Sequence, residues 1–373
     1  MNEKVLIITA TCGEGHNSIA KALAQELELN GAETKICNLY EKNPKIMKFY
    51  NDIYLWACKR VPHIYDAIWH NERKKVKEVI TDSPQYKQIK NYVEYYKTVI
   101  EEYKPTKILC THVGGGAVIS YLKYTNWLPK DIKTYTVLFD YTLCPYWDTN
   151  KYLDYVFSPA DFCEKALVEV GFKKKQIKHF GFPINKKFYK SLDKQEMRKK
   201  LGIEDKFTFM SIAGGNGLGV SVKFLKQILK TEGDYQVMLI CGKNIKAKES
   251  VEKYIQKHNI KNVKVVGFVK NVEEFMSASD VCFARGGGNG LTEALYCNLP
   301  IIFREGLIIN EAENRDLFVE NGCGFKIKNQ KEIKSLCEKI LNSPELIAKM
   351  RKNIEKIIKP EPLVNIVKFM LEN

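Results

Sequence analysis

The stretch VCFARGGGNGLTEALYCNLPIIFREGLIINEAENRDLF, residues 281–318, decides the fold, because one strand-loop-helix unit follows another in it. Residues 281–284 form a short apolar run of the kind that predicts a buried strand. The glycine-rich loop of residues 285–290 allows the backbone to approach a ligand closely, since glycine has no Cβ. A helix is expected to open at Thr292, and a second strand and helix follow. This order is typical of a parallel α/β sheet.

The polar groups of the same stretch suit a diphosphate that carries a sugar at each end, which describes a nucleotide-sugar. A helix N-terminus presents unpaired N–H groups and a positive dipole end to a diphosphate. Glu293, expected in the first turn, can accept two hydrogen bonds from a ribose. Glu311 and Asn314 are spaced i, i+3 and share a helix face that suits a second polyhydroxylated group. The predicted donor-binding residues of the stretch are Arg285, Gly287, Gly288, Asn289, Gly290, Leu291, Thr292, Glu293, Glu311 and Asn314.

The alternative interpretation is an ordinary strand-loop-helix unit whose glycines serve only tight packing. The placement of Glu293, Glu311 and Asn314 behind the loop favours the ligand site over this alternative.

Length and composition restrict the class of protein. The chain has 373 residues, enough for two domains, with 45% hydrophobic and 28% charged residues, which indicates a globular protein. No apolar run approaches the length of a membrane span, and the apolar part of the N-terminal segment is too short for a signal peptide, so a cytoplasmic location is expected. Eleven cysteines without a Cys-x-x-Cys pair indicate a reduced protein. The six histidines form no His-Glu-x-x-His motif, so no dedicated metal site is expected.

The net charge of +15 indicates a polyanionic partner. No motif of a nucleic-acid-binding module occurs in the sequence, so nucleic acid is not expected. An anionic membrane surface is the other candidate. The alternative is a lysine-rich composition that reflects only the source genome.

Strand-like runs alternate with helical patterns along the chain, which implies parallel sheets covered by helices on both faces. The predicted strands are residues 4–10, 34–39, 107–111, 134–139, 155–158, 207–212, 236–241, 263–266, 281–284 and 300–303. Helical patterns such as residues 18–30, 220–230 and 246–258 fill the gaps. We predict two Rossmann-like doubly wound domains that face each other across a cleft, with ligands at the carboxyl ends of the strands.

The polar segment 183–195, which begins with proline, marks the domain boundary. Residues 1–190 are predicted as the N-terminal domain and residues 191–355 as the C-terminal domain. Residues 356–373 form a final helix that is expected to return to the N-terminal domain.

Residues 42–104 break the alternation and are predicted as a helical insertion. An apolar and aromatic stripe with lysine and arginine at its margins suits the bilayer interface. The alternative is an insertion whose stripe packs on its own domain. The stripe consists of Ile46, Phe49, Tyr50, Ile53, Trp56, Ala57, Ile64, Ile68 and Trp69.

A second glycine loop, TCGEGHNS at residues 11–18, follows the first strand. It matches neither a Walker loop nor a dinucleotide fingerprint, because His16 and Asn17 follow Gly15 and a serine replaces the third glycine. What remains is His16 at a helix N-terminus, where the dipole favours neutral imidazole. Such an imidazole is a suitable general base for an acceptor hydroxyl. The alternative is a histidine that caps or orients the loop.

Two further residues at strand ends point to the same cleft. Asp140, after the strand 134–139, is the second candidate for the base or a partner that orients the acceptor. His112, after the strand 107–111, is expected to shape the acceptor side.

Nearly the whole chain resembles the monogalactosyldiacylglycerol synthase and processive diacylglycerol glucosyltransferase family. That family is related to the peptidoglycan GlcNAc transferase that acts on an undecaprenyl-linked muropeptide. The resemblance rests on the order and spacing of Gly13-Glu14-Gly15-His16-Asn17-Ser18, Thr111-His112, Asp140-Tyr141 with Trp147, Gly181-Phe182-Pro183, Gly214-Gly215-Asn216, Cys241-Gly242-Lys243-Asn244, Gly267-Phe268-Val269 and Glu311–Asn314.

The resemblance implies a GT-B fold with a UDP-sugar donor on the C-terminal domain and a lipid acceptor on the N-terminal domain. It also implies inversion at the anomeric carbon without a bound metal or other cofactor, and peripheral attachment to the inner membrane face. His16 is similar to the loop histidine of the family, Phe268 to its uracil-side backbone contact and Glu293 to its ribose ligand. By the same resemblance, Glu311 and Asn314 become hexose contacts. Gly214, Gly215, Asn216, Lys243 and Val269 join the donor site, and Gly13, Gly15, His112 and Trp147 the acceptor side.

Three positions depart from the family pattern. Asn310 stands where the family usually has glutamine, and Cys144 where it often has histidine. Asn289-Gly290 replaces a pair that contains threonine. The first departure bears on the donor hexose, the second on the acceptor, and the third on diphosphate binding, which backbone N–H groups can still provide.

The prediction is an inverting transferase that moves glucose or galactose from a UDP-sugar to diacylglycerol or a glycosyl-diacylglycerol. The alternatives are a UDP-GlcNAc-type transferase to another lipid-linked acceptor, a nucleotide-sugar epimerase on the same fold, and a non-catalytic membrane sensor of UDP-sugars.

Overall fold

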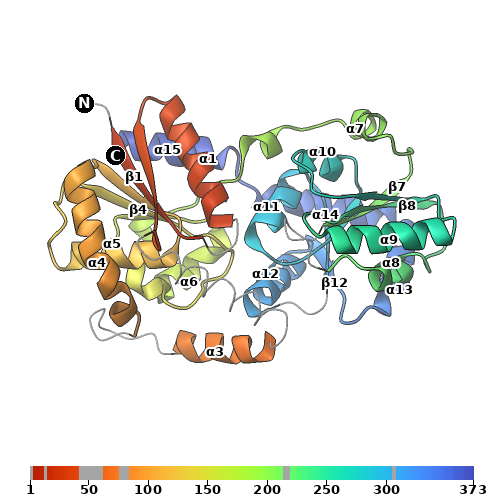
Figure 1. Cartoon of the computed structure of the whole chain (residues 1–373), viewed down its shortest axis with the longest axis horizontal. Coiled ribbons are helices and arrows are strands. Elements are labelled where there is room, and N and C mark those ends of the chain that lie inside the picture. Colours follow the sequence, from red (N-terminus) through yellow and green to blue (C-terminus); the bar gives the residue numbers. More distant parts are fainter. Residues whose placement is uncertain (1–2, 12–14, 42–61, 75–83, 213–218, 305–307) are drawn as a thin grey trace. The chain divides into compact units, whose positions relative to one another are not determined.

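The computed structural model describes residues 3–11, 15–41, 62–74, 84–212, 219–304 and 308–373. The chain forms two compact units, each a parallel sheet with helices packed on it (Figure 1). Unit 1 consists of Met1–Lys186 with Lys359–Asn373, and unit 2 consists of Lys187–Ile358. The division after Lys186 falls close to the predicted boundary after residue 190.

Unit 1 contains a six-stranded parallel sheet in the order β2-β1-β3-β4-β5-β6. Its strands are β1 Lys4–Thr9, β2 Glu33–Asn38, β3 Lys107–Cys110, β4 Lys133–Val137, β5 Tyr155–Phe157 and β6 Ile177–Lys178. The central strands are almost wholly apolar because helices cover both of their faces. β1 lies between β2 and β3, with Ile8 level with Cys110, so the strand order reverses direction at β1.

The helices of unit 1 are α1 Gly15–Leu29, α3 Pro62–Lys74, α4 Pro84–Tyr103, α5 Val113–Tyr124, α6 Glu164–Glu169 and α15 Pro362–Glu372. The C-terminal helix α15 lies beside α1 (blue next to red in Figure 1). It buries Leu363, Ile366, Val367 and Met370, and Phe369 lies edge-on to Tyr155 at 4.9 Å between ring centroids. The end of the chain therefore completes the core of unit 1.

The predicted insertion divides into two parts. In α4, the side chains of Val93, Tyr96 and Val99 belong to the same core as Ile108 of β3, so this part packs on its own sheet. In α3, Ile64 is 48% exposed and Trp69 is half-buried. The side chains of the other residues of the aromatic stripe lie outside the described residues.

Unit 2 contains a second six-stranded parallel sheet, in the order β12-β11-β10-β7-β8-β9. Its strands are β7 Phe207–Ile212, β8 Tyr235–Ile240, β9 Val263–Val266, β10 Val281–Ala284, β11 Ile301–Phe303 and β12 Gly324–Lys326. Its helices are α7 Lys194–Leu201, α8 Val222–Ile228, α9 Ile245–Lys257, α10 Val272–Ser277, α11 Gly288–Tyr296, α12 Ile309–Glu320, α13 Glu332–Leu341 and α14 Pro344–Ile357. The predicted doubly wound α/β class is confirmed for both units.

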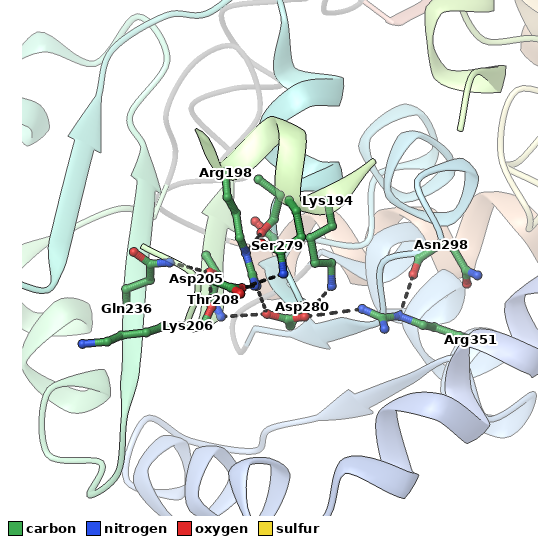
Figure 2. Close-up of polar contacts among 12 residues, drawn as sticks. Lys194, Arg198, Asp205, Lys206, Thr208, Gln236, Ser279, Asp280, Asn298 and Arg351 are labelled. Carbon is green, nitrogen blue, oxygen red and sulfur yellow. Dashed lines mark hydrogen bonds and ion pairs between the residues drawn. The ribbon is translucent and has the colours of Figure 1, made fainter. Parts of the chain in front are cut away.

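A polar cluster fastens the amino end of this second sheet (Figure 2). Asp280, directly before β10, accepts hydrogen bonds from the Arg198 guanidinium at 2.7 Å and the Thr208 backbone N–H at 2.9 Å. Lys194 pairs with the same carboxylate, and Arg351 lies 3.7 Å from it. The cluster ties α7 and α14 to the start of β7 and β10. It lies at the sheet edge opposite the carboxyl ends, so it has a structural role.

Candidate functional site

In unit 2 the strand order reverses between β7 and β10, which are paired neighbours. In open α/β sheets such a reversal opens a crevice at the carboxyl ends of the two strands. The loop of residues 285–287, which follows β10, lies at this point. The loop after β7 includes Gly214, Gly215 and Asn216, and these predicted donor residues lie outside the described residues.

The helix after the glycine loop starts earlier than predicted. α11 begins at Gly288, not at Thr292. The Leu291 N–H donates to the Gly287 carbonyl at 3.1 Å, and the Thr292 hydroxyl donates to the Gly288 carbonyl at 2.7 Å. The prediction of Glu293 in the first turn was therefore wrong, and Glu293 lies in the second turn. The unpaired N–H groups at the helix start belong to the glycine segment itself.

The glycines of the loop serve different purposes. A Cβ on Gly286 would lie 2.0 Å from the Glu311 carbonyl oxygen, so the loop packs directly on the first turn of α12. The tight-packing interpretation therefore applies to Gly286. A Cβ on Gly290 would meet nothing within 4 Å, so packing does not explain this glycine.

Glu311 and Asn314 share a helix face as predicted, but that face is turned toward the glycine loop. The Asn314 side-chain amide donates to the Gly286 carbonyl at 2.7 Å, and Asn314 is 0% exposed. Arg285 forms a two-pronged ion pair with Glu311, at 3.0 Å and 2.6 Å. In this structure both predicted hexose contacts therefore hold the loop. The close approach at Gly286 is the reason, because it brings α12 within reach.

Two other predicted donor residues lie in the core. Leu291 and Thr292 are fully buried, since they face the sheet from the first two turns of α11. Their side chains support the helix and offer no surface to a ligand.

Glu293 is electrostatically unusual. Its pKa is raised to about 7, mainly by burial of the carboxyl; the charge of Lys187 opposes the shift, and that of Glu273 adds to it. Lys187 and Glu273 form an ion pair with each other. A carboxyl with this pKa changes charge near neutrality, which singles it out as a candidate for a functional role. Glu273 and Lys187 were not predicted as site residues, because they lie in other elements.

The other side of the same sheet edge contains an exposed aromatic ring. Phe268 follows β9 and is 56% exposed, and Lys243 follows β8 with its ammonium 5.7 Å from the ring centroid. Val269 is half-buried. Because strands β8 and β9 are parallel and paired, the predicted donor residues Lys243 and Phe268 lie together at the carboxyl edge.

In unit 1 the corresponding reversal lies between β1 and β3. His16, in the first turn of α1, lies at this edge, and its Nδ1 is 2.6 Å from the Thr111 carbonyl oxygen. A carbonyl only accepts, so Nδ1 carries the proton and Nε2 is the basic nitrogen. The ring stacks on Phe139 at 3.6 Å.

Burial lowers the pKa of His16 to about 4, although the hydrogen bond to Thr111 opposes the shift. The imidazole is therefore neutral at physiological pH. The position of His16 at a helix N-terminus predicted neutrality from the helix dipole, whereas the structure attributes it mainly to loss of solvation. Thr111 and Phe139, both missed as site residues, hold the ring. Each is the last residue of a predicted strand, and Thr111 also belongs to a motif of the family resemblance.

His112 lies next to His16, with ring centroids 4.8 Å apart and edge-on. It is the N-cap of α5, and its Nδ1 accepts the Gly114 N–H at 3.1 Å. Burial, and then the neighbouring His16, lower the pKa of His112 well below its usual range. The structure thus brings the two predicted histidines together and gives His112 a capping role.

The remaining predicted residues of unit 1 are placed as follows. Asp140 directly follows Phe139, and its carboxylate accepts the Tyr141 N–H at 3.1 Å. Gly15 is the first residue of α1. Trp147 is 3% exposed and packs near Phe172, so it belongs to the core. Gly13 lies outside the described residues.

Comparison with known proteins agrees with this architecture. Residues 16–184 match the family profile described as monogalactosyldiacylglycerol (MGDG) synthase, and residues 185–357 match that of glycosyl transferases group 1. The processive diacylglycerol beta-glucosyltransferase of Bacillus licheniformis is 26% identical over 366 residues, which cover 95% of this chain and 91% of the relative.

Solved structures share the fold. MurG of Acinetobacter baumannii superposes with a TM-score of 0.67 at 10% identity, over 100% of both chains. Anabaena HepE in complex with UDP-glucose superposes with a TM-score of 0.56 at 14% identity, over 99% of both chains.

The chain is thus a glycosyltransferase of the GT-B fold. Its resemblance to the monogalactosyldiacylglycerol synthase and processive diacylglycerol glucosyltransferase family, predicted from the order of its motifs, is confirmed.

Among the described residues, no helix has the length and apolar character needed to cross a membrane. No three His, Cys, Asp or Glu side chains of the described ranges converge as metal ligands. Independence from metal remains a prediction.

Proposed function

We propose that the chain transfers glucose or galactose from a UDP-sugar to diacylglycerol or a glycosyl-diacylglycerol, with inversion at the anomeric carbon. The observation that carries the proposal is the His16 imidazole, which is held neutral with Nε2 as its basic nitrogen at the strand-order reversal of unit 1. The choice of substrates is supported by relatives named processive diacylglycerol beta-glucosyltransferase, which align with 95% of the chain.

Unit 2 would bind the donor at the carboxyl edge of its sheet. The backbone N–H groups of the glycine segment 287–290 and the Arg285 guanidinium suit the diphosphate. Glu293 suits the ribose hydroxyls. The backbone at Phe268 and Val269 suits the uracil. Gly214, Gly215, Asn216 and Lys243 remain predicted donor contacts.

The Arg285–Glu311 ion pair determines when the Glu311 carboxylate is available to the hexose. A diphosphate competes with the Glu311 carboxylate for the Arg285 guanidinium, because both anions suit its planar donors. Transfer of Arg285 to the diphosphate frees the carboxylate to accept hydrogen bonds from the hexose. Asn314 keeps its bond to Gly286 and positions the loop.

In the proposed reaction, His16 Nε2 removes the proton of the acceptor hydroxyl as its oxygen attacks the anomeric carbon. The bond from that carbon to the UDP oxygen breaks on the opposite face, which inverts the configuration. The start of α11 and Arg285 stabilise the negative charge on UDP. The Thr111 carbonyl, which accepts from Nδ1, orients the ring and stabilises the imidazolium. Asp140 is the second candidate for the base.

We further propose peripheral attachment to the inner face of the membrane through the segment 42–104. The support is the net charge of +15 and the exposed Ile64 on α3. Sedimentation with anionic vesicles measures this attachment, and a chain that stays in the supernatant contradicts it.

The decisive experiment supplies liposomes that contain diacylglycerol with radiolabelled UDP-glucose, UDP-galactose or UDP-GlcNAc. Label from UDP-glucose or UDP-galactose is expected in the lipid phase, and liposomes without diacylglycerol are the control. Label from UDP-GlcNAc alone would favour the GlcNAc-type alternative. Conversion of the sugar without lipid would indicate an epimerase, and binding without transfer a sensor.

A further inference from the structure

A basic pocket lies at the edge of the unit 1 sheet opposite the catalytic loops. Its cavity of about 690 Å³ is bordered by the segments that lead into β5 and β6. Because all six strands are parallel, these amino ends lie opposite the carboxyl ends that precede His16, His112 and Asp140. The pocket therefore does not belong to the site already described.

Four lysines line the pocket: Lys151, Lys173, Lys175 and Lys178. Within the part of the chain that the structure describes, none of them forms an ion pair. The middle lysine of the run 173–175 behaves differently, since Lys174 pairs with Glu164 at 3.1 Å and does not line the pocket. The charge of Lys151 acts on the Asp148 carboxyl and opposes the rise of its pKa, but forms no ion pair with it. The pocket thus collects lysines with little local charge compensation.

The lining also contains the carboxylate of Asp154, but this charge is already neutralised. Asp154 forms an ion pair with Lys123 and accepts hydrogen bonds from the N–H and hydroxyl of Thr134, at 2.9 Å and 2.8 Å. The pocket is therefore strongly positive.

The walls of the pocket are tied together. The Gln176 side-chain amide donates to the Leu153 carbonyl at 2.6 Å and to the Lys151 carbonyl at 3.2 Å. Its carbonyl oxygen accepts the Lys173 N–H at 2.7 Å. Gly171 has a φ of +104°, and a Cβ there would meet the Lys151 side chain at 2.9 Å, so the glycine leaves the room that Lys151 occupies. The lysines thus project from a pre-organised frame.

Aromatic rings support two of the ammonium groups. The Lys151 ammonium lies 5.6 Å from the Tyr152 ring centroid, and that of Lys178 lies 5.5 Å from Tyr155 and 5.3 Å from Phe369. Cation–π contacts hold both groups in place. Because Tyr152 and Tyr155 also line the pocket, an organic group beside an anion has an apolar surface to contact.

We propose that this pocket binds an anion that carries a phosphate group. Several ammonium groups around one cavity suit phosphate oxygens, which accept hydrogen bonds from many directions. The volume falls within the roughly 300–1,000 Å³ of small-molecule sites. The phosphate belongs either to a dissolved compound or to the headgroup of an anionic phospholipid. The proposal does not rest on the transferase activity.

The test compares two double variants that lose the same charge. Lys173→Gln with Lys175→Gln removes two exposed lysines of the pocket, and Lys253→Gln with Lys257→Gln removes two exposed lysines of α9 in unit 2. Calorimetry measures the binding of pyrophosphate to the unchanged chain and to both variants. Any binding at the donor site is common to all three, so the pocket is assessed from the difference between them. Sedimentation measures binding to phosphatidylcholine vesicles with and without phosphatidylglycerol.

The pocket variant is expected to bind at least about tenfold more weakly than the unchanged chain, and the α9 variant equally well. A loss confined to pyrophosphate supports a dissolved ligand, and a loss confined to phosphatidylglycerol vesicles supports a lipid headgroup. Equal losses in the two variants, or no binding of either probe by the unchanged chain, would overturn the proposal. The result does not depend on transfer, so failure of the transferase assay leaves it interpretable.

Discussion

The two strand-order reversals both flank the first strand of their sheet, β1 or β7, and have opposite chemistry. At the β1/β3 edge of unit 1, His16 packs against the rings of Phe139 and His112, and burial keeps both imidazoles neutral. At the β7/β10 edge of unit 2, Arg285 and Glu311 form an ion pair, and Glu293 changes charge near neutrality. Topology thus locates a site, while side chains decide whether it suits proton transfer or an anion.

The largest expected effect concerns His16 at the β1/β3 edge of unit 1, where burial keeps the imidazoles neutral. His16→Ala should lower turnover by roughly 10²–10⁴-fold, because it removes the proposed base. The Michaelis constant for the UDP-sugar should stay nearly constant, and initial rates with liposomes measure both. His258→Ala, an exposed histidine after α9, is the matched control. Near-normal turnover of His16→Ala would transfer the role of base to Asp140 or another group.

The next test separates packing from binding within the glycine loop. Gly286→Ala should lower the free energy of unfolding by about 1–3 kcal/mol or more, because its Cβ would collide with the Glu311 carbonyl. Gly290→Ala should stabilise the chain by up to about 1 kcal/mol, because its Cβ meets open space within a helix. Urea unfolding measures both. Weaker UDP-sugar binding in a stable Gly290→Ala would show that a ligand approaches there.

The third test uses the charge of Glu293. If the ionised carboxyl binds the ribose, UDP-sugar affinity should fall about tenfold for each pH unit below 7, because the pKa of Glu293 is raised to about 7. In Glu293→Gln this pH dependence should disappear, and calorimetry from pH 5 to pH 8 measures it. His16, with a pKa of about 4, does not titrate in this window.

The same raised pKa affects stability. Between pH 4.5 and about 7 the folded state binds more protons than the unfolded state. The stability that the protonated Glu293 carboxyl contributes is therefore fully present below pH 4.5 and is lost as the pH rises through 7. Glu293→Gln should therefore be more stable than the unchanged chain at pH 8 in the absence of ligand. Lower stability at that pH would contradict a buried charge at this position.

The smallest expected effect concerns His112. His112→Ala should lower the free energy of unfolding by about 1 kcal/mol, because it removes the acceptor for the Gly114 N–H at the start of α5. His112→Asn should restore stability, since asparagine is a good N-cap. Thermal unfolding measures the stability, and the liposome assay measures turnover. Normal turnover in His112→Asn would limit the role of His112 to capping, whereas lost turnover would show an acceptor contact.

Local patterns predicted most elements of both units. The ranges of β7, β9 and β10 agree with the predicted strands, because short apolar runs next to turns are a local signal. β6 and β12 were missed, since Ile-Lys and Gly-Phe-Lys are not apolar runs, unlike the equally short β5 and β11. The start of α11 at Gly288 was also missed, because glycines are poor helix formers and the earlier turn is revealed only by the hydrogen bonds of Leu291 and Thr292.

The sequence by itself determined the class of fold and the segments that end at the two strand-order reversals. It did so because periodicity and glycine loops are properties of neighbouring residues. Only the tertiary structure decided that Arg285 holds Glu311, that Gly286 packs on α12, and that four lysines from two segments surround one pocket. These contacts join residues far apart in the chain, and their burial, charge and pKa values exist only after the chain has folded.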